Sequence, residues 1–317
     1  MNERQRIAML ARVLGADAPG VVRGIGDDAA VLDASGRLVW TIDEQVEGVH
    51  FRRDLVCWRD VGWRSFMAAA SDVAAMGAEP WCALAALVLP EDLDDASLGA
   101  LARGQREAAV EARAPIVGGN LSRGPVLSVA TTFLGRCTRA IERRGARPGD
   151  GVWLAGRVGL AAAGLRALSS GRKGPGIEAA VDAWARPRAR FEEGRAMAAS
   201  ATAAVDISDG LAGDIGHLAE SSAVRVVLDA HTLLDDEDLV AAASVLGVAA
   251  LELALYGGED YAIVATAREV LPGFRRIGEV RDGAGVAVRT DEGERPVAPL
   301  GFDHFTGPSK PPAASGS

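Results

Sequence analysis

Aspartates interrupt apolar sequence at four places along the chain. They are Asp27 and Asp28 in GIGDDAAVL, Asp43 in TIDEQVEGVHF, Asp72 in SDVAAMGAEP, and Asp206 and Asp209 in VDISDGL. An ionised carboxylate among apolar residues is costly to bury unless it is paired, and no lysine lies near Asp72. Mg²⁺ can satisfy several carboxylates and still bind water and phosphate oxygens. The pattern therefore indicates a carboxylate cluster that holds Mg²⁺ for a polyphosphate.

Each aspartate taken alone has a simpler explanation. An Asp beside a Gly is often a turn residue or a helix N-cap, and this applies to Asp27 and to Asp209. It does not apply to Asp72, which lies inside a predicted helix over residues 60–76 that ends at Gly77.

The usual phosphate-binding loops are absent from the sequence. No GxxxxGK[ST] motif occurs, the only lysines are Lys173 and Lys310, and GIGDDA places acids where a dinucleotide pyrophosphate would approach. In GGNLSRG, residues 118–124, backbone N–H groups after a strand could meet an oxyanion, or the segment could be a plain turn. The net charge of −9 argues against a nucleic-acid surface.

The elements that must position these residues form two α/β halves, joined near residues 145–150. The predicted helices cover residues 3–14, 60–76, about 91–113, about 160–168, 188–199 and a segment from Leu211. The predicted strands cover residues 29–32, 38–42, 81–89, 114–117, 126–134, 151–155, 203–207, 224–228, 261–265 and 275–280.

Apolar runs and cysteine spacing predict the cellular location of the protein. The longest apolar run, Trp81–Leu89, is too short to span a membrane, and the first residues lack a secretory pattern. Three widely spaced cysteines, Cys57, Cys82 and Cys137, are read as reduced core thiols of a cytoplasmic protein. The tail over residues 306–317 is rich in Pro, Ser, Gly and Ala and is expected to be disordered.

Eight motifs together resemble the thiamine-monophosphate kinase family. GIGDDAAVL, TIDEQVEGVHF, SDVAAMGAEP, GGNLSRG, RPGDGVWLAG, VDISDGL, GGEDY and GFDHF follow one another from Gly24 to Phe305 in that family's order. The resemblance implies the two-domain α/β fold of the aminoimidazole ribonucleotide synthetase superfamily. Residues 1–147 would form an N-terminal domain that dimerises through its sheet, and residues 148–305 a C-terminal domain, with the active site between them.

The resemblance also implies a reaction and its residues. The γ-phosphate of ATP would pass directly to thiamine monophosphate, giving thiamine diphosphate and ADP, with several Mg²⁺ ions and no phosphoenzyme. The implied metal positions are Asp28, Thr41, Asp43, Asp72, Asn120, Asp206 and Asp209, of which Asp43, Asp72 and Asp209 would be catalytic. The implied ATP contacts are Gly119, Asn120, Arg143 and Ser208, and the implied thiamine phosphate contacts are His50, Glu259 and Phe302.

Several of these residues have structural alternatives. His50 could be an interior histidine, Glu259 a helix-terminus acid, Phe302 a core aromatic and Arg143 a solvated surface charge. The chain also departs from the family at three positions: Asn120 stands for an Asp, Ile42 for a Thr, and Phe302 for a Trp or Tyr. Glu44 could compensate for the charge lost at Asn120.

Two other functions stay open. The first is a non-catalytic paralogue that binds ATP or thiamine phosphate, weakened at Asn120. The second is another ATP-dependent member of the superfamily. Against that, the first cysteine, Cys57, lies in a different setting from the reactive residue of selenophosphate synthetases, and the chain ends in SGS rather than in the cysteine tail of the hydrogenase-maturation relative. The purine-synthesis relatives lack the GFDHF ending. The expected partners are ATP, thiamine monophosphate and a second copy of the chain, with no nucleic acid or membrane.

Overall fold

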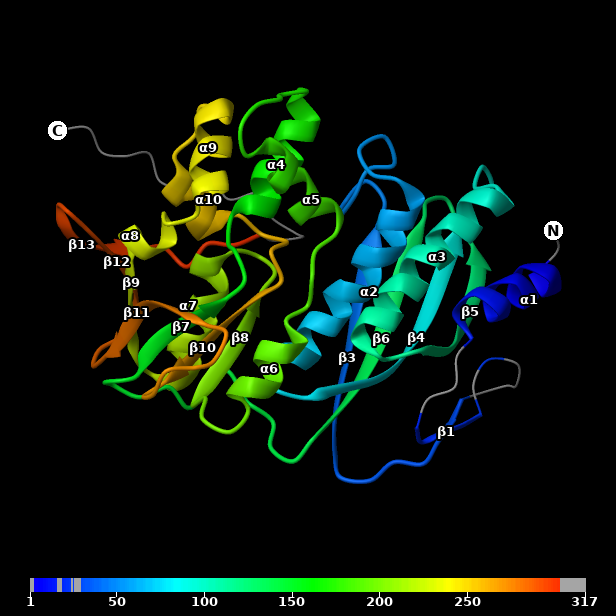
Figure 1. The fold of residues 1–317 in the computed structure, drawn as a ribbon, viewed down its shortest axis with the longest axis horizontal. Coiled ribbons are helices and arrows are strands. Elements are labelled where there is room, and N and C mark those ends of the chain that lie inside the picture. The colour runs from blue at the N-terminus through cyan, green and yellow to red at the C-terminus, as the bar shows by residue number, and fades with distance from the viewer. Residues whose placement is uncertain (1–2, 16–18, 24, 26–29, 303–317) are drawn as a thin grey trace. The chain divides into compact units, whose positions relative to one another are not determined.

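The computed structural model describes residues 3–15, 19–23, 25 and 30–302 (Figure 1). Asp27, Asp28 and the predicted tail over residues 306–317 lie outside the described residues. The chain forms two compact units. Unit 1 comprises Met1–Ala140 and Ala185–Ala198, and unit 2 comprises Ile141–Trp184 and Ala199–Ser317.

This division differs from the predicted boundary after residue 147. The first break falls after Ala140, and the segment Ala185–Ala198 returns to unit 1. The indole Nε1–H of Trp63 donates a hydrogen bond to the carbonyl oxygen of Pro187 at 2.6 Å. A Cβ on Gly194 would lie 2.3 Å from the carbonyl oxygen of Ala74, so glycine lets the backbone of this segment touch a helix of unit 1.

Unit 1 is a helix layer on a four-stranded sheet. Its helices are α1 (Glu3–Leu14), α2 (Trp58–Ala75), α3 (Asp95–Ala112) and α6 (Phe191–Met197). Its strands are β1 (Val21–Arg23), β2 (Val31–Leu32), β3 (Arg37–Val46), β4 (Glu79–Leu89), β5 (Ile116–Arg123) and β6 (Ser128–Cys137). The large sheet has the order β3-β6-β4-β5, with only the β4–β5 pair parallel, and β1 pairs with β2 separately.

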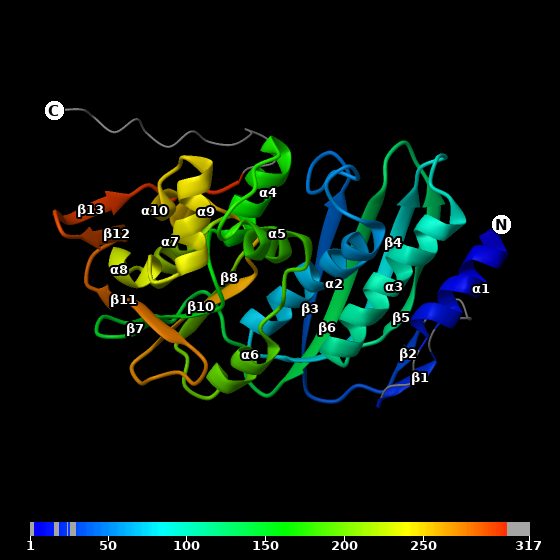
Figure 2. The same ribbon diagram turned by 45° about the horizontal axis from the view of Figure 1, so that its top comes forward.

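Figures 1 and 2 show α2 and α3 on the same side of this sheet. The two helices approach closely because glycines face each other's backbone. A Cβ on Gly62 would lie 1.9 Å from the carbonyl oxygen of Leu101, and one on Gly104 would lie 1.7 Å from that of Arg59. Phe66 of α2 packs edge-on against Phe133 of β6, with ring centroids 5.1 Å apart. As a result, α2 is buried on nearly every side.

Unit 2 is a seven-stranded sheet with helices. Its strands are β7 (Gly151–Ala155), β8 (Ala203–Ile207), β9 (Arg225–Asp229), β10 (Ala262–Ala267), β11 (Arg275–Arg281), β12 (Gly285–Thr290) and β13 (Gly293–Val297). Its helices are α4 (Leu160–Ser170), α5 (Ile177–Ala185), α7 (Leu211–Ser222), α8 (Ala230–Leu233), α9 (Glu237–Leu246) and α10 (Ala250–Tyr256). The strand order is β13-β12-β9-β11-β7-β10-β8, and only the β9–β12 pair is parallel.

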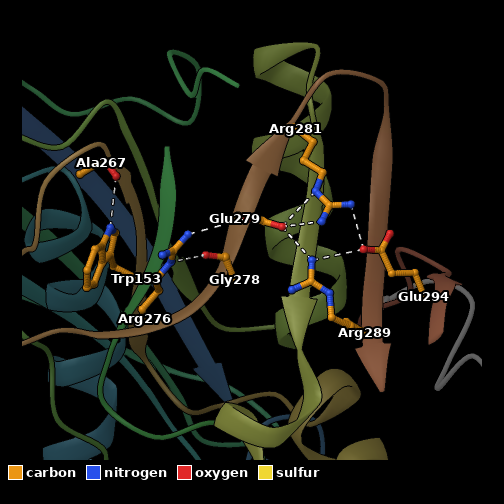
Figure 3. Close-up of polar contacts among 8 residues, drawn as sticks. All are labelled: Trp153, Ala267, Arg276, Gly278, Glu279, Arg281, Arg289 and Glu294. Carbon is orange, nitrogen blue, oxygen red and sulfur yellow. Dashed lines mark hydrogen bonds and ion pairs between the residues drawn. The ribbon is translucent and has the colours of Figure 1, made fainter. Parts of the chain in front are cut away.

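Charged side chains link the outer strands of this sheet (Figure 3). Glu279 of β11 accepts a hydrogen bond from Arg289 of β12 at 2.7 Å, and Glu294 of β13 accepts one from Arg281 at 2.9 Å. Nearer the centre, the indole of Trp153 donates to the carbonyl oxygen of Ala267 at 3.2 Å. Ion pairs this exposed contribute about 1 kcal/mol or less each, so they align strand ends rather than hold the unit together.

Two predictions about local structure are wrong. The turn considered for residues 118–124 is not formed, because Gly118 and Gly119 lie within β5. A Cβ on Gly119 would lie 1.9 Å from the carbonyl oxygen of Ala85, so these glycines serve close strand approach. Among the cysteines, Cys82 is buried as predicted, whereas Cys57 is exposed and Cys137 half-buried.

No single helix in the described ranges is long and apolar enough to cross a membrane, although the bent pair α9–α10 together passes the same length and composition test.

Candidate functional site

In unit 1, Thr41 and Asp43 lie on the face of the sheet that α2 covers. Side chains alternate along a strand, and the hydroxyl of Thr41 donates to Oδ2 of Asp72 on α2 at 2.5 Å. Asp43, two residues further along β3, shares this face. Its Oδ1 accepts the backbone N–H of Glu44 at 2.6 Å. The structure therefore places three of the implied metal positions on two adjacent elements.

Arg64 and Gln45 extend this row and are not among the implied site residues. Gln45 follows Asp43 on the same face of β3, and its Oε1 accepts a hydrogen bond from Nε of Arg64 at 3.2 Å. Both side chains are buried, Arg64 completely. A buried arginine in a long apolar helix is a signal that could have been noticed, because an unpaired guanidinium is costly to bury.

Glu44 and Ile42 point to the opposite face of the sheet. The Glu44 carboxylate accepts a hydrogen bond from the hydroxyl of Ser128, and Ile42 is 66% exposed. Glu44 therefore does not lie on the face that carries Asp43, and its compensation for the charge lost at Asn120 stays a prediction. The Thr-to-Ile departure at position 42 also leaves the face that carries Thr41 and Asp43 unchanged.

Gly119 and Asn120 point to opposite faces of the unit 1 sheet. Gly119 pairs with Ala85, which lies in line with Thr131 and Asp43. Asn120 pairs with Ala86, in line with Ala130 and Glu44. Paired residues point to the same face of a sheet, so Asn120 lies on the face away from Asp43 and on the far edge strand. The structure does not bring Asn120 into the Thr41–Asp43–Asp72 group, and its role stays a prediction.

His50 lies in the turn that follows β3. Its backbone N–H donates to the carbonyl oxygen of Val46 at 2.9 Å, and the N–H of Val46 donates back to Nδ1 of the His50 ring at 3.0 Å. A neutral imidazole that accepts at Nδ1 carries its proton on Nε2. The ring is only half-buried, so His50 is not the interior histidine considered from the sequence, and Nε2 is its remaining donor.

In unit 2, Asp206, Ser208 and Asp209 lie where β8 ends and α7 begins. Asp206 pairs with Ile263 of β10 and is buried, on the face opposite Val205 and Ile207, which pack into the core. Burial raises the pKa of Asp214, in the first turn of α7, to about 7, and the charge of Asp209 adds to this shift. The Asp214 carboxylate accepts the backbone N–H groups of Ser208 and Asp209 at 3.0 and 3.1 Å. It thereby fixes the turn that presents both residues.

The GGEDY segment lies against this turn. The N–H of Glu259 donates to the carbonyl oxygen of Ser208 at 2.7 Å, and the N–H of Tyr261 donates to that of Ile207 at 2.8 Å. Glu259 and Tyr261 have φ angles of 69° and 48°, in a left-handed region that costs about 1–3 kcal/mol for residues other than glycine. Glu259 lies beyond the end of α10 at Tyr256, so the alternative of a helix-terminus acid does not describe it.

Phe302 joins the same cluster. Its N–H donates to the carbonyl oxygen of Asp209 at 3.1 Å, and a Cβ on Gly301 would lie 3.1 Å from Cβ of Asp209. Phe302 is 44% exposed, so it is not a core aromatic. The structure thus brings Asp209, Ser208, Glu259 and Phe302 together from segments far apart in the sequence.

Arg143 lies elsewhere in unit 2. Its carbonyl oxygen accepts a hydrogen bond from the hydroxyl of Ser222, at the C-terminal end of α7, at 3.1 Å. Ser208 and Asp209 precede the N-terminus of that helix, and twelve residues of helix span about 18 Å. The structure does not bring Arg143 beside Ser208, and a role in binding ATP stays a prediction.

The side chains present suit Mg²⁺ in their chemistry. Thr41, Asp43, Asp72, Asp206 and Asp209 offer hydroxyl and carboxylate oxygens, the donors that Mg²⁺ prefers. Within the part of the chain that the structure describes, no group of three or more His, Cys, Asp or Glu side chains could hold a metal by itself. Mg²⁺ at nucleotide sites is usually held by one or two carboxylates, with phosphate oxygens and water completing the coordination. The donors of each unit therefore fit a metal that arrives with a polyphosphate.

The class of protein follows from comparison with known families and structures. Residues 26–137 match the family model of the AIR synthase related protein, N-terminal domain. A solved structure of AaThiL complexed with AMPPCP and TMP superposes with a TM-score of 0.80 at 33% identity, over 96% of this chain and 97% of that one. The thiamine-monophosphate kinase of Stenotrophomonas maltophilia K279a gives 0.78 at 34% identity, over 89% of this chain and 94% of that one. The predicted AIR synthase-like α/β fold is confirmed.

A curated relative identifies the family. The thiamine-monophosphate kinase of Aquifex aeolicus is 35% identical over 288 residues, which cover 89% of this chain and 92% of that protein. The chain belongs to the thiamine-monophosphate kinase family.

Proposed function

We propose that this protein transfers the γ-phosphate of ATP to thiamine monophosphate, with Mg²⁺, and releases thiamine diphosphate and ADP. The observation that supports this most directly is the cluster in unit 2, where backbone hydrogen bonds join Glu259 to Ser208 and Phe302 to Asp209. These residues belong to three family motifs that lie far apart in the sequence. A related structure holds both AMPPCP, which resembles ATP, and TMP.

These residues suit phosphoryl transfer without a covalent intermediate. The acceptor is already an ionised phosphate, so the reaction needs alignment of the two reactants and neutralisation of their charge more than a strong base. Mg²⁺ supplies that neutralisation when bound. We propose that Mg²⁺ ions bind to Thr41, Asp43 and Asp72 in unit 1 and to Asp206 and Asp209 in unit 2.

Glu259 and Phe302 suit the thiamine end of the acceptor. Thiamine carries a cationic thiazolium ring, which an aromatic face and a carboxylate both attract. The exposed Phe302 lies on a segment that contacts Asp209, and Glu259 lies on a segment that contacts the neighbouring Ser208. The missing polar edge of a Trp or Tyr at position 302 therefore leaves the stacking surface in place.

The deciding experiment incubates the purified full-length protein with ATP, Mg²⁺ and thiamine monophosphate, and separates the products by chromatography. We expect thiamine diphosphate and ADP in equal amounts, no product with free thiamine as acceptor, and no product when EDTA removes Mg²⁺. Binding of both reactants without product would favour the non-catalytic paralogue instead. The requirement for ATP leads us to expect the reaction in the cytoplasm.

We also propose that the protein works as a homodimer through the sheet of unit 1. The open face of edge strand β3 carries Leu38, Trp40 and Ile42, which are 45%, 72% and 66% exposed. A row of apolar side chains this exposed is typical of a surface that another protein covers. A second copy of the same strand could cover it symmetrically.

A further inference from the structure

Asp260 lies next to an implied substrate contact, yet its own side chain points into the protein. Its carboxylate is buried between the GGEDY segment and the start of α4. Oδ2 accepts the backbone N–H of Gly159 at 2.6 Å, and Oδ1 accepts that of Ala161 at 3.1 Å. Each oxygen therefore accepts a different N–H group at the N-terminus of α4. These N–H groups have no hydrogen-bond acceptor within the helix.

The α4 end of this contact is itself held in place. Gly159 has φ of 82°, and a Cβ on it would lie 2.5 Å from the backbone of Leu253 in α10. Arg157, two residues earlier, pairs through Nε with Oδ2 of Asp236 at 2.6 Å and through Nη2 with Oδ2 of Asp238 at 2.8 Å. Asp260 therefore anchors the GGEDY segment to a rigid corner of unit 2.

The residues on both sides of Asp260 are strained. Glu259 and Tyr261 have left-handed φ angles, and their N–H groups reach the end of β8. Strained backbone persists only where surrounding contacts determine it, and it gathers at functional sites. Two of those contacts join the segment to β8, and the two hydrogen bonds of the Asp260 carboxylate join it to α4.

We propose that Asp260 is a positioning residue for the thiamine-phosphate acceptor, because its two hydrogen bonds to α4 hold Glu259 in the strained conformation that presents the Glu259 carboxylate. This inference rests on the proposed function, in which Glu259 contacts thiamine monophosphate. The turn that carries Ser208 has its own anchor in Asp214. Loss of the Asp260 contacts should therefore weaken binding of thiamine monophosphate and leave binding of ATP unchanged.

The test is Asp260→Asn in the full-length protein, assayed at about pH 8, above the Asp260 pKa of about 7. An amide has one acceptor oxygen, so one of the two α4 N–H groups would face an NH₂ group instead. We expect KM for thiamine monophosphate to rise roughly ten-fold, because small misplacements of a substrate contact have large effects. KM for ATP should stay within about two-fold.

A double-mutant cycle with Glu259→Gln separates positioning from general damage. If Asp260 acts through Glu259, Asp260→Asn should raise the acceptor KM by less than about two-fold in the Glu259→Gln background, because residues that share one role are not additive. Calorimetric binding of thiamine monophosphate without ATP should follow the same pattern. Additive effects, or equal changes in both KM values, would overturn the inference.

The matched control is Asp150→Asn, the same chemical change at another buried aspartate of unit 2. Asp150 precedes β7, at the opposite end of that strand from Gly159, and its Oδ2 accepts from Arg147 N–H and the Thr202 hydroxyl. We expect both KM values to be unchanged in this variant. If the wild-type protein makes no thiamine diphosphate, the proposed function fails. Wild-type turnover with an unaltered acceptor KM in Asp260→Asn refutes only the role of Asp260.

Discussion

At the scale of single residues, aspartates of one chain serve different purposes because their neighbours differ. Asp72 is half-buried and accepts the hydroxyl of Thr41. Asp260 is buried and accepts two backbone N–H groups, and Asp94 is an exposed helix cap. A carboxylate enclosed by N–H donors has little capacity left for a ligand. Asp72 is therefore a better metal candidate than Asp260.

Asp72→Asn tests that assignment. We expect kcat to fall by roughly 100-fold or more, because a neutral amide neutralises less of the phosphate and metal charge. The melting temperature should change little, since Asn can still accept the Thr41 hydroxyl. The measurements are steady-state turnover and a thermal melt.

The control for Asp72→Asn is Asp94→Asn, the same change in the same unit. Asp94 caps α3 by accepting the N–H of Ser97 at 2.7 Å, and Asn is an equally good N-cap. Turnover and stability should both match the wild type. Wild-type kinetics in Asp72→Asn would remove Asp72 from the metal site.

At the scale of elements, the site of unit 2 depends on how closely two loops approach. The segment after α10 lies against the turn after β8, and Gly258 permits this contact. A Cβ at Gly258 would lie 2.6 Å from the carbonyl oxygen of Ser208. The backbone rather than the side chains thus sets the distance between Glu259 and Ser208.

Gly258→Ala should therefore destabilise the protein by about 1–3 kcal/mol, as overpacking generally does, and raise KM for thiamine monophosphate. Gly99→Ala is the contrasting change, because Gly99 lies within α3 and its added Cβ would meet only side-chain atoms at 3.4 Å or more. Alanine there should stabilise the protein by about 0.5–1 kcal/mol. Urea unfolding of both variants measures the change in the free energy of unfolding. A stabilising effect of Gly258→Ala would contradict the close contact between Gly258 and Ser208.

Burial of the Asp260 carboxylate should also make the free energy of unfolding depend on pH. Burial raises the pKa of Asp260 from its ordinary 3.8 to about 7, despite the hydrogen bonds from Gly159 and Ala161 and the charge of Arg157, while Asp236 adds to the rise. Between these values the folded state binds the proton more tightly than the unfolded state. This contribution to stability is therefore fully present below about pH 4 and is lost as pH rises through about 7.

We expect the free energy of unfolding of the wild type, relative to Asp260→Asn, to decrease between about pH 5 and pH 8. Urea unfolding of both proteins across that range provides the measurement, and the difference between them removes the titration of all other groups. A difference that stays constant with pH would show that Asp260 titrates normally.

At the scale of the whole molecule, the chain crosses between two units more than once. Ala185–Ala198 leaves the sequence of unit 2 and packs against α2, through Trp63 and Gly194. Arg186 in this segment also pairs with Asp60 of α2 at 3.0 Å. The predicted single boundary after residue 147 would separate this segment from its partners, so a truncated protein cut there would lose contacts in unit 1.

The exposed face of β3 leads to a prediction about assembly. Trp40→Glu places a charge on the apolar row and should convert a dimer of the 32.8 kDa chain into a monomer, because burying an unpaired carboxylate is costly. Light scattering after size-exclusion chromatography measures the mass. Val270→Glu is the control, since Val270 is 74% exposed in unit 2. A wild-type monomer would refute the dimer.

Local patterns of residues were sufficient to predict many of the helices and strands and to identify the family. The bounds of α1, β7 and β8 agree with their predictions, because apolar periodicity and turn residues are local signals. The order of the motifs was enough to identify the family that the comparisons confirm. Helices α9 and α10 were not predicted, and Gly118 and Gly119 were open to being a turn when they are part of β5.

Which residues lie together in a site follows from the packing of the folded chain. Strand register places Gly119 in line with Asp43 but Asn120 in line with Glu44, although the two residues are neighbours in sequence. Hydrogen bonds between distant segments join Glu259 to Ser208 and Phe302 to Asp209. Register and close backbone approach depend on the packing of the whole unit, and no local pattern of residues encodes them.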